Sequence, residues 1–200
     1  MIDVRVFQMF GFLVERQFLT REECERLRGD MRRAAAEAAG VVHHRGDVVD
    51  LGHRSTKRVS VSDASYSLIE ERLAALRPRL VEHFHVELTG MQPPQFLRYG
   101  AGDFFRCHAD TSDRPGAPDY LAVRKISTII FLGHPADDAP AEGPGGELVF
   151  HGLIDDQRMQ NRGFAFPPDE GTFLAFPSTA MHEVKTITAG ERYSVVTWFY

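Results

Sequence analysis

The sequence contains little cysteine: Cys24 and Cys107 are the two cysteines in 200 residues. Two thiols cannot form the disulfide framework on which small secreted domains depend. The opening stretch, MIDVRVFQMFGFLVERQF, interleaves charged and apolar residues, and it lacks the continuous apolar core and the small-residue cleavage site of a secretory signal. These absences predict a protein of a reducing, cytoplasmic compartment.

Long hydrophobic runs and clustered basic residues are also missing. No stretch approaches the roughly 20 apolar residues that cross a bilayer, so we expect no membrane span. The formal net charge is −5 and the basic residues are scattered, which argues against a nucleic-acid partner. What is present, 200 residues that are 43% hydrophobic, suffices for one globular domain with its own core. None of these features indicates the oligomeric state.

The first half of the chain is expected to be largely helical. The stretch LTREECERLRGDMRRAAAEAAG has Thr20 as a candidate N-cap and Glu23 three residues later, the pattern of a capping box. Gly40 is the candidate end of this helix. A second helix is predicted from Asp63, and Pro78 should kink it or begin a new turn.

The second half changes to short β-like segments separated by glycine, proline and aspartate, a texture typical of a sandwich or barrel such as a jelly roll. We therefore divide a single domain of 200 residues into a helical support region, 1–94, and a jelly-roll core, 95–200. Two long breaks, 111–120 and 133–146, are candidates for functional or mobile loops. Gly145-Gly146 at the end of the second break predicts a bulge or a close approach between backbones.

A histidine and an aspartate lie two residues apart in the strand-like segment FRCHAD. Residues i and i+2 of a strand project to the same face, so His108 and Asp110 can converge on one point, while Cys107 faces away as a small buried residue. Taken alone, such a pair is more often a satisfied core contact than a metal site. His182 changes this, because two histidines and one carboxylate form the facial triad that leaves positions open on a non-haem Fe(II).

Arg192 opens the last strand-like segment, RYSVVTWFY. A forked guanidinium at this place suits a carboxylate ligand. The alternative is a surface arginine in a salt bridge, which would contribute little stability.

The ordered residues carry a resemblance to a known family. Along the chain stand Tyr99, His108-x-Asp110, Gly145-Gly146, His182, Arg192 and Trp198. This order resembles the prolyl 4-hydroxylase-like branch of the Fe(II)/2-oxoglutarate-dependent dioxygenases. The likeness extends over nearly the whole chain, from FLTREECERLR and GHRSTKRVSV through FLRYGAGDFFRCHAD, RKISTIIFLG and GGELVF to PPDEGTFLAFPSTAMHEVKTITAGERYSVVTWF.

The resemblance implies a fold, a cofactor and a reaction. The fold would be mainly β, a double-stranded β-helix (a cupin-like jelly roll) with the N-terminal helices packed on one sheet. Fe(II) would be held by His108, Asp110 and His182, and the cosubstrate 2-oxoglutarate by Arg192 and Tyr99. With O2, and with ascorbate as a supportive reductant, the enzyme would release succinate and CO2 and hydroxylate an unactivated C–H bond. The carboxylate of Asp110 favours hydroxylation over halogenation.

Some positions depart from the family's pattern or admit two interpretations. Phe131 stands where several relatives carry a tyrosine, so the distal carboxylate of 2-oxoglutarate would depend more on Arg192, with Ser127 or Thr128 as possible helpers. Trp198 occupies the place of a second arginine in nucleic-acid repair relatives, which argues against base demethylation. Arg124 is a candidate substrate contact, and the alternative is an exposed arginine at a strand end.

The substrate is the point at which the sequence leaves alternatives open. The resemblance favours a prolyl or other residue of a peptide or protein, or an amino-acid-like molecule. The same scaffold also serves small-molecule natural-product intermediates. A further alternative, of another class, is a non-catalytic metal-binding or sensing jelly roll, although such a protein would not require Arg192 and Tyr99.

Overall fold

The structure of the protein is a computed structural model. It describes residues 3–39, 41–43, 46–48, 52–115, 117–133, 145–156, 158–159, 162–167 and 169–200, with backbone alone for 41–43 and 46–48. Most of the 133–146 break therefore lies outside the described residues, and its role stays a prediction. The 111–120 break is described except for residue 116, and it leads into a short helix.

Helices concentrate in the first half and strands in the second. In chain order the elements are α1 (Val4–Met9), β1 (Leu13–Glu15), α2 (Arg21–Arg33), β2 (Ala36–Ala38), β3 (Val41–His43), β4 (Gly46–Val48), β5 (Arg54–Ser55), β6 (Lys57–Val59), α3 (Asp63–Phe84), β7 (Gln95–Tyr99), β8 (Phe104–His108), α4 (Asp119–Ala122), β9 (Ile126–Phe131), β10 (Leu148–His151), β11 (Phe164–Phe166), β12 (Phe173–Pro177), β13 (Met181–Val184) and β14 (Arg192–Phe199). Among the described residues, no helix is both long and apolar enough to cross a membrane.

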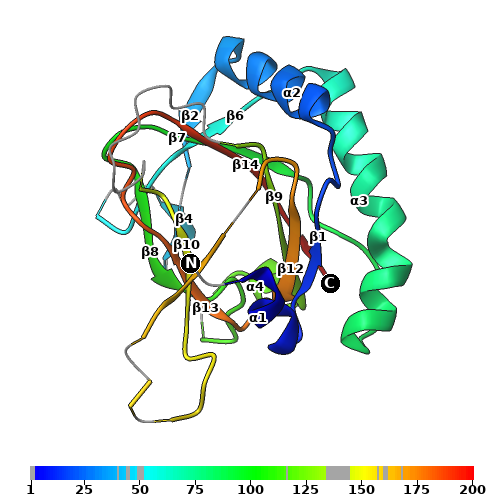
Figure 1. Ribbon diagram of the computed structural model, residues 1–200, viewed down its shortest axis with the longest axis vertical. Coiled ribbons are helices and arrows are strands. Elements are labelled where there is room, and N and C mark those ends of the chain that lie inside the picture. Colours follow the sequence, from blue (N-terminus) through cyan, green and yellow to red (C-terminus); the bar gives the residue numbers. More distant parts are fainter. Residues whose placement is uncertain are drawn as a thin grey trace.

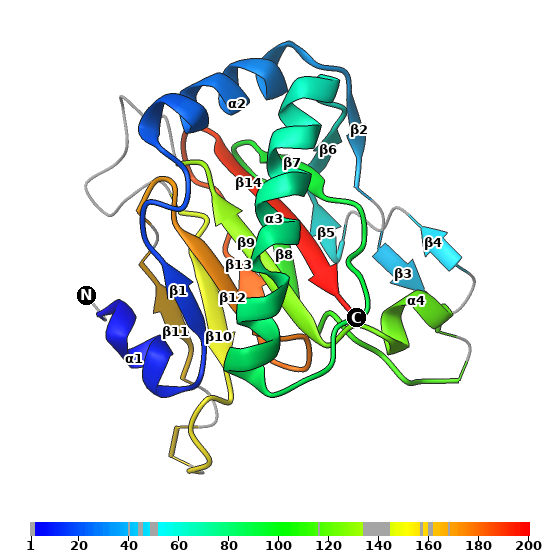
Figure 2. The ribbon, with the colours of Figure 1, turned by 90° about the vertical axis from the view of Figure 1, so that its right-hand side faces the viewer.

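Two antiparallel sheets face each other (Figure 1). The larger has the order β1-β12-β9-β14-β7-β6-β2, and the smaller has the order β11-β10-β13-β8-β5. A separate pair, β3 and β4, lies near α4 at one side of the molecule (Figure 2). From β7 to β14, strands that are consecutive in the sequence are mostly not adjacent in a sheet, as expected for a double-stranded β-helix.

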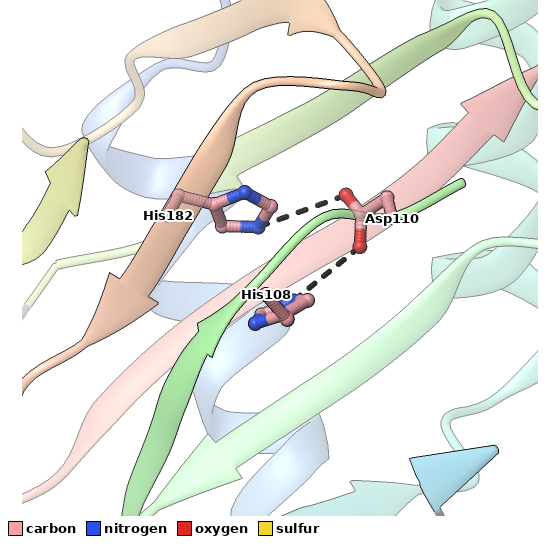
Figure 3. Close-up of side chains that lie close together, drawn as sticks. All are labelled: His108, Asp110 and His182. Carbon is pink, nitrogen blue, oxygen red and sulfur yellow. Dashed lines mark ion pairs between the residues drawn. The ribbon is translucent and has the colours of Figure 1, made fainter. Parts of the chain in front are cut away.

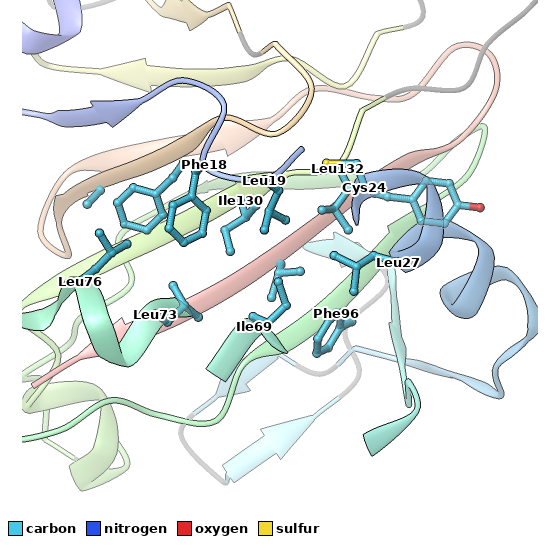
Figure 4. Close-up of a cluster of buried hydrophobic side chains, with 14 of the residues drawn as sticks. Phe18, Leu19, Cys24, Leu27, Ile69, Leu73, Leu76, Phe96, Ile130 and Leu132 are labelled. Carbon is cyan, nitrogen blue, oxygen red and sulfur yellow. The ribbon is translucent and has the colours of Figure 1, made fainter. Parts of the chain in front are cut away.

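Strand alternation divides the large sheet into two faces. In β14, Tyr193 and Val195 pack toward α2 and α3, in the cluster that includes Leu27 and Ile69 (Figure 4). The other face looks into the space between the sheets, where Arg192 lines a cavity. The helices thus cover one sheet from outside, as predicted, and leave the space between the sheets for the site (Figures 1 and 2).

The capping box predicted for the first helix is confirmed. The Thr20 hydroxyl accepts from the N–H of Glu23 at 3.2 Å, and the Glu23 carboxylate accepts from the N–H of Thr20 at 2.8 Å. The predicted end at Gly40 is wrong: α2 ends at Arg33, and Ala36–Ala38 form β2. Pairing of β2 with β6 thus overrides the helix propensity of alanine. The second helix begins at Asp63 as predicted.

Two further expectations for the first half can be compared with the structure. α3 runs through Pro78 as one helix, so no new helix begins there, and the alternative of a kink stays a prediction. The support region is also less helical than expected, because β1, β2, β5 and β6 join the two sheets. These strands are two or three residues long, too short for a periodic pattern to show in the sequence.

The backbone approach predicted at Gly145-Gly146 is confirmed. Gly145 has φ +72°, and a Cβ at this position would lie 2.2 Å from the carbonyl oxygen of Thr186. Gly145 also forms an isolated antiparallel bridge with Ile187. A residue without a side chain is therefore required where the chain enters β10.

Candidate metal centre

Strand pairing brings the two histidines together. β8 and β13 are antiparallel neighbours, and His108 lies directly opposite His182 in their register. A register shift follows between His182 and Val184. Asp110 lies two residues beyond the end of β8, and its N–H donates to the carbonyl of Ser178 at 2.9 Å.

The three side chains meet at one point between the sheets (Figure 3). Nε2 of His108 lies 3.5 Å from Oδ1 of Asp110, and Nε2 of His182 lies 3.7 Å from Oδ2. One ligand atom from each residue falls within 4.8 Å of the others. The carboxylate therefore faces both imidazoles, as the sequence predicted, across a gap in which a metal ion could be bound.

Backbone carbonyls fix the tautomers of both histidines. Nδ1 of His108 lies 2.8 Å from the carbonyl oxygen of Arg106, and Nδ1 of His182 lies 2.9 Å from that of Ala180. A carbonyl can only accept, so Nδ1 carries the proton in each ring. In its neutral form, each ring then presents the lone pair of Nε2 to the shared point, the arrangement expected of histidine metal ligands.

The electrostatics of the cluster keep the carboxylate charged and one imidazole neutral. Burial alone would raise the pKa of Asp110, but the two imidazoles and the Ser127 hydroxyl outweigh it, and the pKa lies well below its usual value. Burial and the nearby His108 lower the pKa of His182 to about 4. A carboxylate with two neutral imidazoles is the donor set of a non-haem Fe(II) site.

Arg192 lines the same cavity as this cluster, and no carboxylate of the described residues forms a salt bridge with it. It is 3% exposed, so the alternative of a surface arginine is wrong. Nη1 donates weakly to Ser194 at 3.4 Å, and within the described residues Nη2 is buried with no hydrogen-bond partner. Burial lowers the pKa of Arg192, while the Tyr99 hydroxyl opposes that shift. A buried guanidinium with an unused donor is costly unless an anion pairs with it, so this position fits a carboxylate ligand.

Tyr99 and Phe131 flank the guanidinium. Tyr99 faces Arg192 across the β7–β14 pair and is 2% exposed. Cζ of Arg192 lies 5.2 Å from the ring centroid of Tyr99 and 5.6 Å from that of Phe131. The two hydroxyls considered as helpers are used elsewhere, because Ser127 pairs with Ser178 and Thr128 donates to the carbonyl of Thr197.

One cavity of about 620 Å³ joins these groups. Its lining includes His108, Asp110, His182, Tyr99, Arg192 and Arg124. The volume falls within the range of small-molecule sites, roughly 300–1,000 Å³. The predicted site residues, which are far apart in the sequence, thus line one cavity. Their side chains fit both an Fe(II) ion and a dicarboxylate.

Arg124 lines the cavity but is already engaged. Nε and Nη2 donate to Oε1 of Gln92 at 3.0 and 2.7 Å, and Nη1 donates to the carbonyl of Asp110 at 3.1 Å. Its Cζ lies 3.6 Å from the ring centroid of Trp198. Arg124 is part-buried and is not the exposed strand-end residue of the alternative, whereas contact with a substrate stays a prediction.

Two residues that contact the site carry no signal in the sequence, and the burial predicted for a third is wrong. Gln92 and Ser178 contact the site from irregular segments, where no periodic pattern marks them. Cys107 was expected to be a small buried residue that faces away from the cluster, but it is exposed and is among the residues that line the cavity. α2 and α3 cover the seven-stranded sheet, so they do not shield this strand of the smaller sheet.

Solved structures show the same fold. A prolyl-4-hydroxylase of Pseudomonas putida superposes with a TM-score of 0.72 and 22% identity, covering 98% of this chain and 96% of that one. A prolyl hydroxylase of Trichoplax adhaerens, in complex with a peptide of the hypoxia inducible factor oxygen degradation domain, gives a TM-score of 0.71 and 18% identity over 98% and 86% of the chains. These likenesses confirm the predicted jelly roll.

Sequence comparison identifies the family. A PKHD-type hydroxylase of Gluconacetobacter diazotrophicus is 35% identical over 107 residues, which is 53% of this chain and 42% of that protein. The chain thus spans less than half the length of this relative. The model of the 2OG-Fe(II) oxygenase superfamily matches residues 94–200, which contain all the candidate ligands. The chain belongs to the 2OG-Fe(II) oxygenase superfamily.

Proposed function

We propose that this chain is an Fe(II)- and 2-oxoglutarate-dependent dioxygenase that hydroxylates an unactivated C–H bond. The observation that supports it best is the pairing, in one cavity, of the His108–Asp110–His182 cluster with a buried guanidinium that has an unused donor. A metal site alone would not need that guanidinium. In the overall reaction, 2-oxoglutarate, O2 and the C–H substrate yield succinate, CO2 and the hydroxylated product.

Each part of the site has a separate task in this proposal. His108, Asp110 and His182 would hold Fe(II), which supplies the oxidising chemistry when bound. Arg192 would bind the distal carboxylate of 2-oxoglutarate, and Tyr99 would point its hydroxyl toward the cosubstrate, which fixes the direction in which the cosubstrate enters. Buried apolar side chains from both sheets, among them Leu97, keep water away and strengthen these electrostatic contacts.

The proposed substrate is a prolyl or other amino-acid residue, or an amino-acid-like molecule. Relatives named as prolyl hydroxylases, one of them bound to a peptide, support this choice. The cavity lining also includes the aromatic residues Tyr120 and Trp198, and aromatic rings can pack against a pyrrolidine ring. A small-molecule natural-product intermediate remains the second candidate. We also propose a single domain in a cytoplasmic setting, which the two free thiols support.

The test begins with cosubstrate turnover. Purified protein with Fe(II), ascorbate and 2-oxoglutarate should form succinate slowly alone, and faster with a true substrate. Proline-containing peptides, free amino acids and natural-product intermediates form the panel, and mass spectrometry should find a product heavier by one oxygen. Stimulation by natural-product intermediates alone would favour the second candidate.

The non-catalytic alternative makes a different prediction in the same experiment. A metal-binding or sensing jelly roll would bind Fe(II) but would not bind 2-oxoglutarate. Iron-loaded protein that shows no 2-oxoglutarate binding would therefore overturn the enzyme proposal.

A further inference from the structure

Asp110 is held differently from the two histidines beside it. His108 and His182 are partners in the ladder between β8 and β13. Asp110 lies in a bend beyond β8, outside any strand. A side chain that must point at one place needs a fixed backbone, so contacts other than sheet pairing have to orient this residue.

Two contacts hold the main chain of Asp110. Its N–H donates to the carbonyl of Ser178 at 2.9 Å. Its carbonyl accepts from Nη1 of Arg124 at 3.1 Å. The two peptide groups that flank Asp110 are thereby fixed, and the carboxylate is left to face His108 and His182.

Arg124 is itself rigidly placed. Two of its nitrogens donate to Oε1 of Gln92, and its guanidinium stacks on the ring of Trp198 in β14. The N–H of Gln92 donates to the carbonyl of Trp198 at 2.8 Å, and its Nε2 donates to the carbonyl of Tyr120 at 2.8 Å. Because the amide nitrogen of Gln92 points to Tyr120, its oxygen must face Arg124.

We infer that Arg124 is a positioning residue for the metal ligand Asp110. A line of contacts runs from β14 through Trp198 and Gln92 to Arg124, and from there to the carbonyl of Asp110. This role rests on the proposed function, since it presupposes that Asp110 binds the metal. It differs from the substrate contact that the sequence suggested, because the donors of Arg124 are directed at the protein.

The effect to measure is metal affinity in the absence of substrate. Loss of an outer contact to a metal ligand typically lowers metal affinity or activity by about 10- to 100-fold. Arg124→Met keeps most of the apolar stem and removes the donors, so Fe(II) binding should weaken by this factor. Arg124→Lys can restore the hydrogen bond to Asp110 but not the paired bonds to Gln92, so it should recover part of the loss.

The experiment is anaerobic equilibrium dialysis of the metal-free full chain against Fe(II). The charge-transfer absorption on adding 2-oxoglutarate gives a second, spectroscopic readout. The matched control is Arg114→Met, which removes an exposed arginine that also lines the cavity. Its Fe(II) affinity should stay within about twofold of the parent. Thermal midpoints of the metal-free variants show whether each one is folded.

The outcomes separate this inference from the proposed function. Unchanged Fe(II) affinity in Arg124→Met, with a raised KM for substrate, would overturn the positioning role and return Arg124 to substrate contact. If Arg124→Met does not fold, Arg124→Lys and Gln92→Leu replace it, and unchanged affinity in both overturns the inference. A parent protein that binds no Fe(II) would instead overturn the proposed function itself.

Discussion

At the scale of single residues, Asp110 supplies the one carboxylate in the cluster of candidate ligands. Its low pKa shows that the surrounding imidazoles favour the charged form despite burial. Asp110→Ala should therefore lower Fe(II) affinity by more than about 100-fold, beyond the effect of losing an outer contact, and abolish succinate formation. Dialysis and a succinate assay measure both. Asp113→Ala, an exposed aspartate of the following loop, is the control. Hydroxylation retained by Asp110→Ala would contradict the ligand assignment.

Arg192 should determine the affinity for 2-oxoglutarate without affecting the affinity for Fe(II). A hydrogen-bonded charged contact contributes about 1.5–3 kcal/mol, so Arg192→Met should weaken 2-oxoglutarate binding by about 10- to 100-fold. Fe(II) affinity should change little. Arg98→Met is the matched control. Arg98 lies in the same strand pair, opposite Tyr193, but its side chain is on the face of the sheet that points away from the cavity. Titration of 2-oxoglutarate into the Fe(II)-loaded proteins gives the constants, and equal values for parent and Arg192→Met would refute the role.

The sequence could predict residues whose roles follow from strand alternation. Arg192 begins a strand whose alternate residues line the cavity. His108 and Asp110 meet as expected from their spacing, but Asp110 lies in a bend beyond β8, so backbone contacts and not strand alternation place its side chain. Gln92 and Ser178 could not be found in this way. They reach the site from turns, whose positions depend on how β14 and β9 pack and not on local pattern.

At the scale of elements, the capping box fixes where α2 begins. The side chain of Thr20 satisfies an N–H at the first turn that has no partner within the helix. Thr20→Ala should cost about 1 kcal/mol of the free energy of unfolding, measured by urea denaturation. Arg26→Ala, an exposed change in the same helix, should stay within about 0.5 kcal/mol. Equal losses in the two variants would show that the cap contributes nothing specific.

Gly145 fixes where the chain enters β10. Both Gly145 and Gly11 have positive φ, but a Cβ at Gly145 would meet the backbone of Thr186 and Thr188, whereas one at Gly11 would meet nothing within 4 Å. Gly11→Ala should cost about 1–2 kcal/mol for the left-handed conformation alone. Gly145→Ala should cost clearly more, because backbone must move. Urea denaturation of both variants measures the difference, and equal losses would mean that the contact is relieved easily.

Elements were predictable where they are long and periodic. The helix predicted after Thr20, α2, has an N-cap and an apolar stripe, and its predicted start was correct. Its end was wrong because Ala36–Ala38 have no intrinsic strand signal and are extended only through pairing with β6. The two-residue strand Arg54–Ser55 likewise exists only beside β8.

At the scale of the whole molecule, two separate cores surround the site. One lies between the helices and the large sheet, and the other lies between the two sheets, beside the cavity. His108 and His182 come from the small sheet and Arg192 from the large one. Binding metal and cosubstrate would therefore link both sheets, and it should stabilise the folded molecule as a unit.

This linkage gives a test that needs no turnover. A ligand at 100 times its dissociation constant adds about 2.7 kcal/mol to the free energy of unfolding. For a domain of this size that corresponds to a rise of about 5–10 °C in the thermal midpoint. Mn(II), which can occupy such a donor set without driving turnover, should produce one increment, and 2-oxoglutarate a second that depends on the metal. Asp110→Ala should lose both increments, whereas Arg192→Met should keep the first and show a much smaller second one. If 2-oxoglutarate stabilises Arg192→Met as much as it stabilises the parent, its distal carboxylate does not bind the buried guanidinium. The proposed position of the cosubstrate between the two sheets would then be wrong.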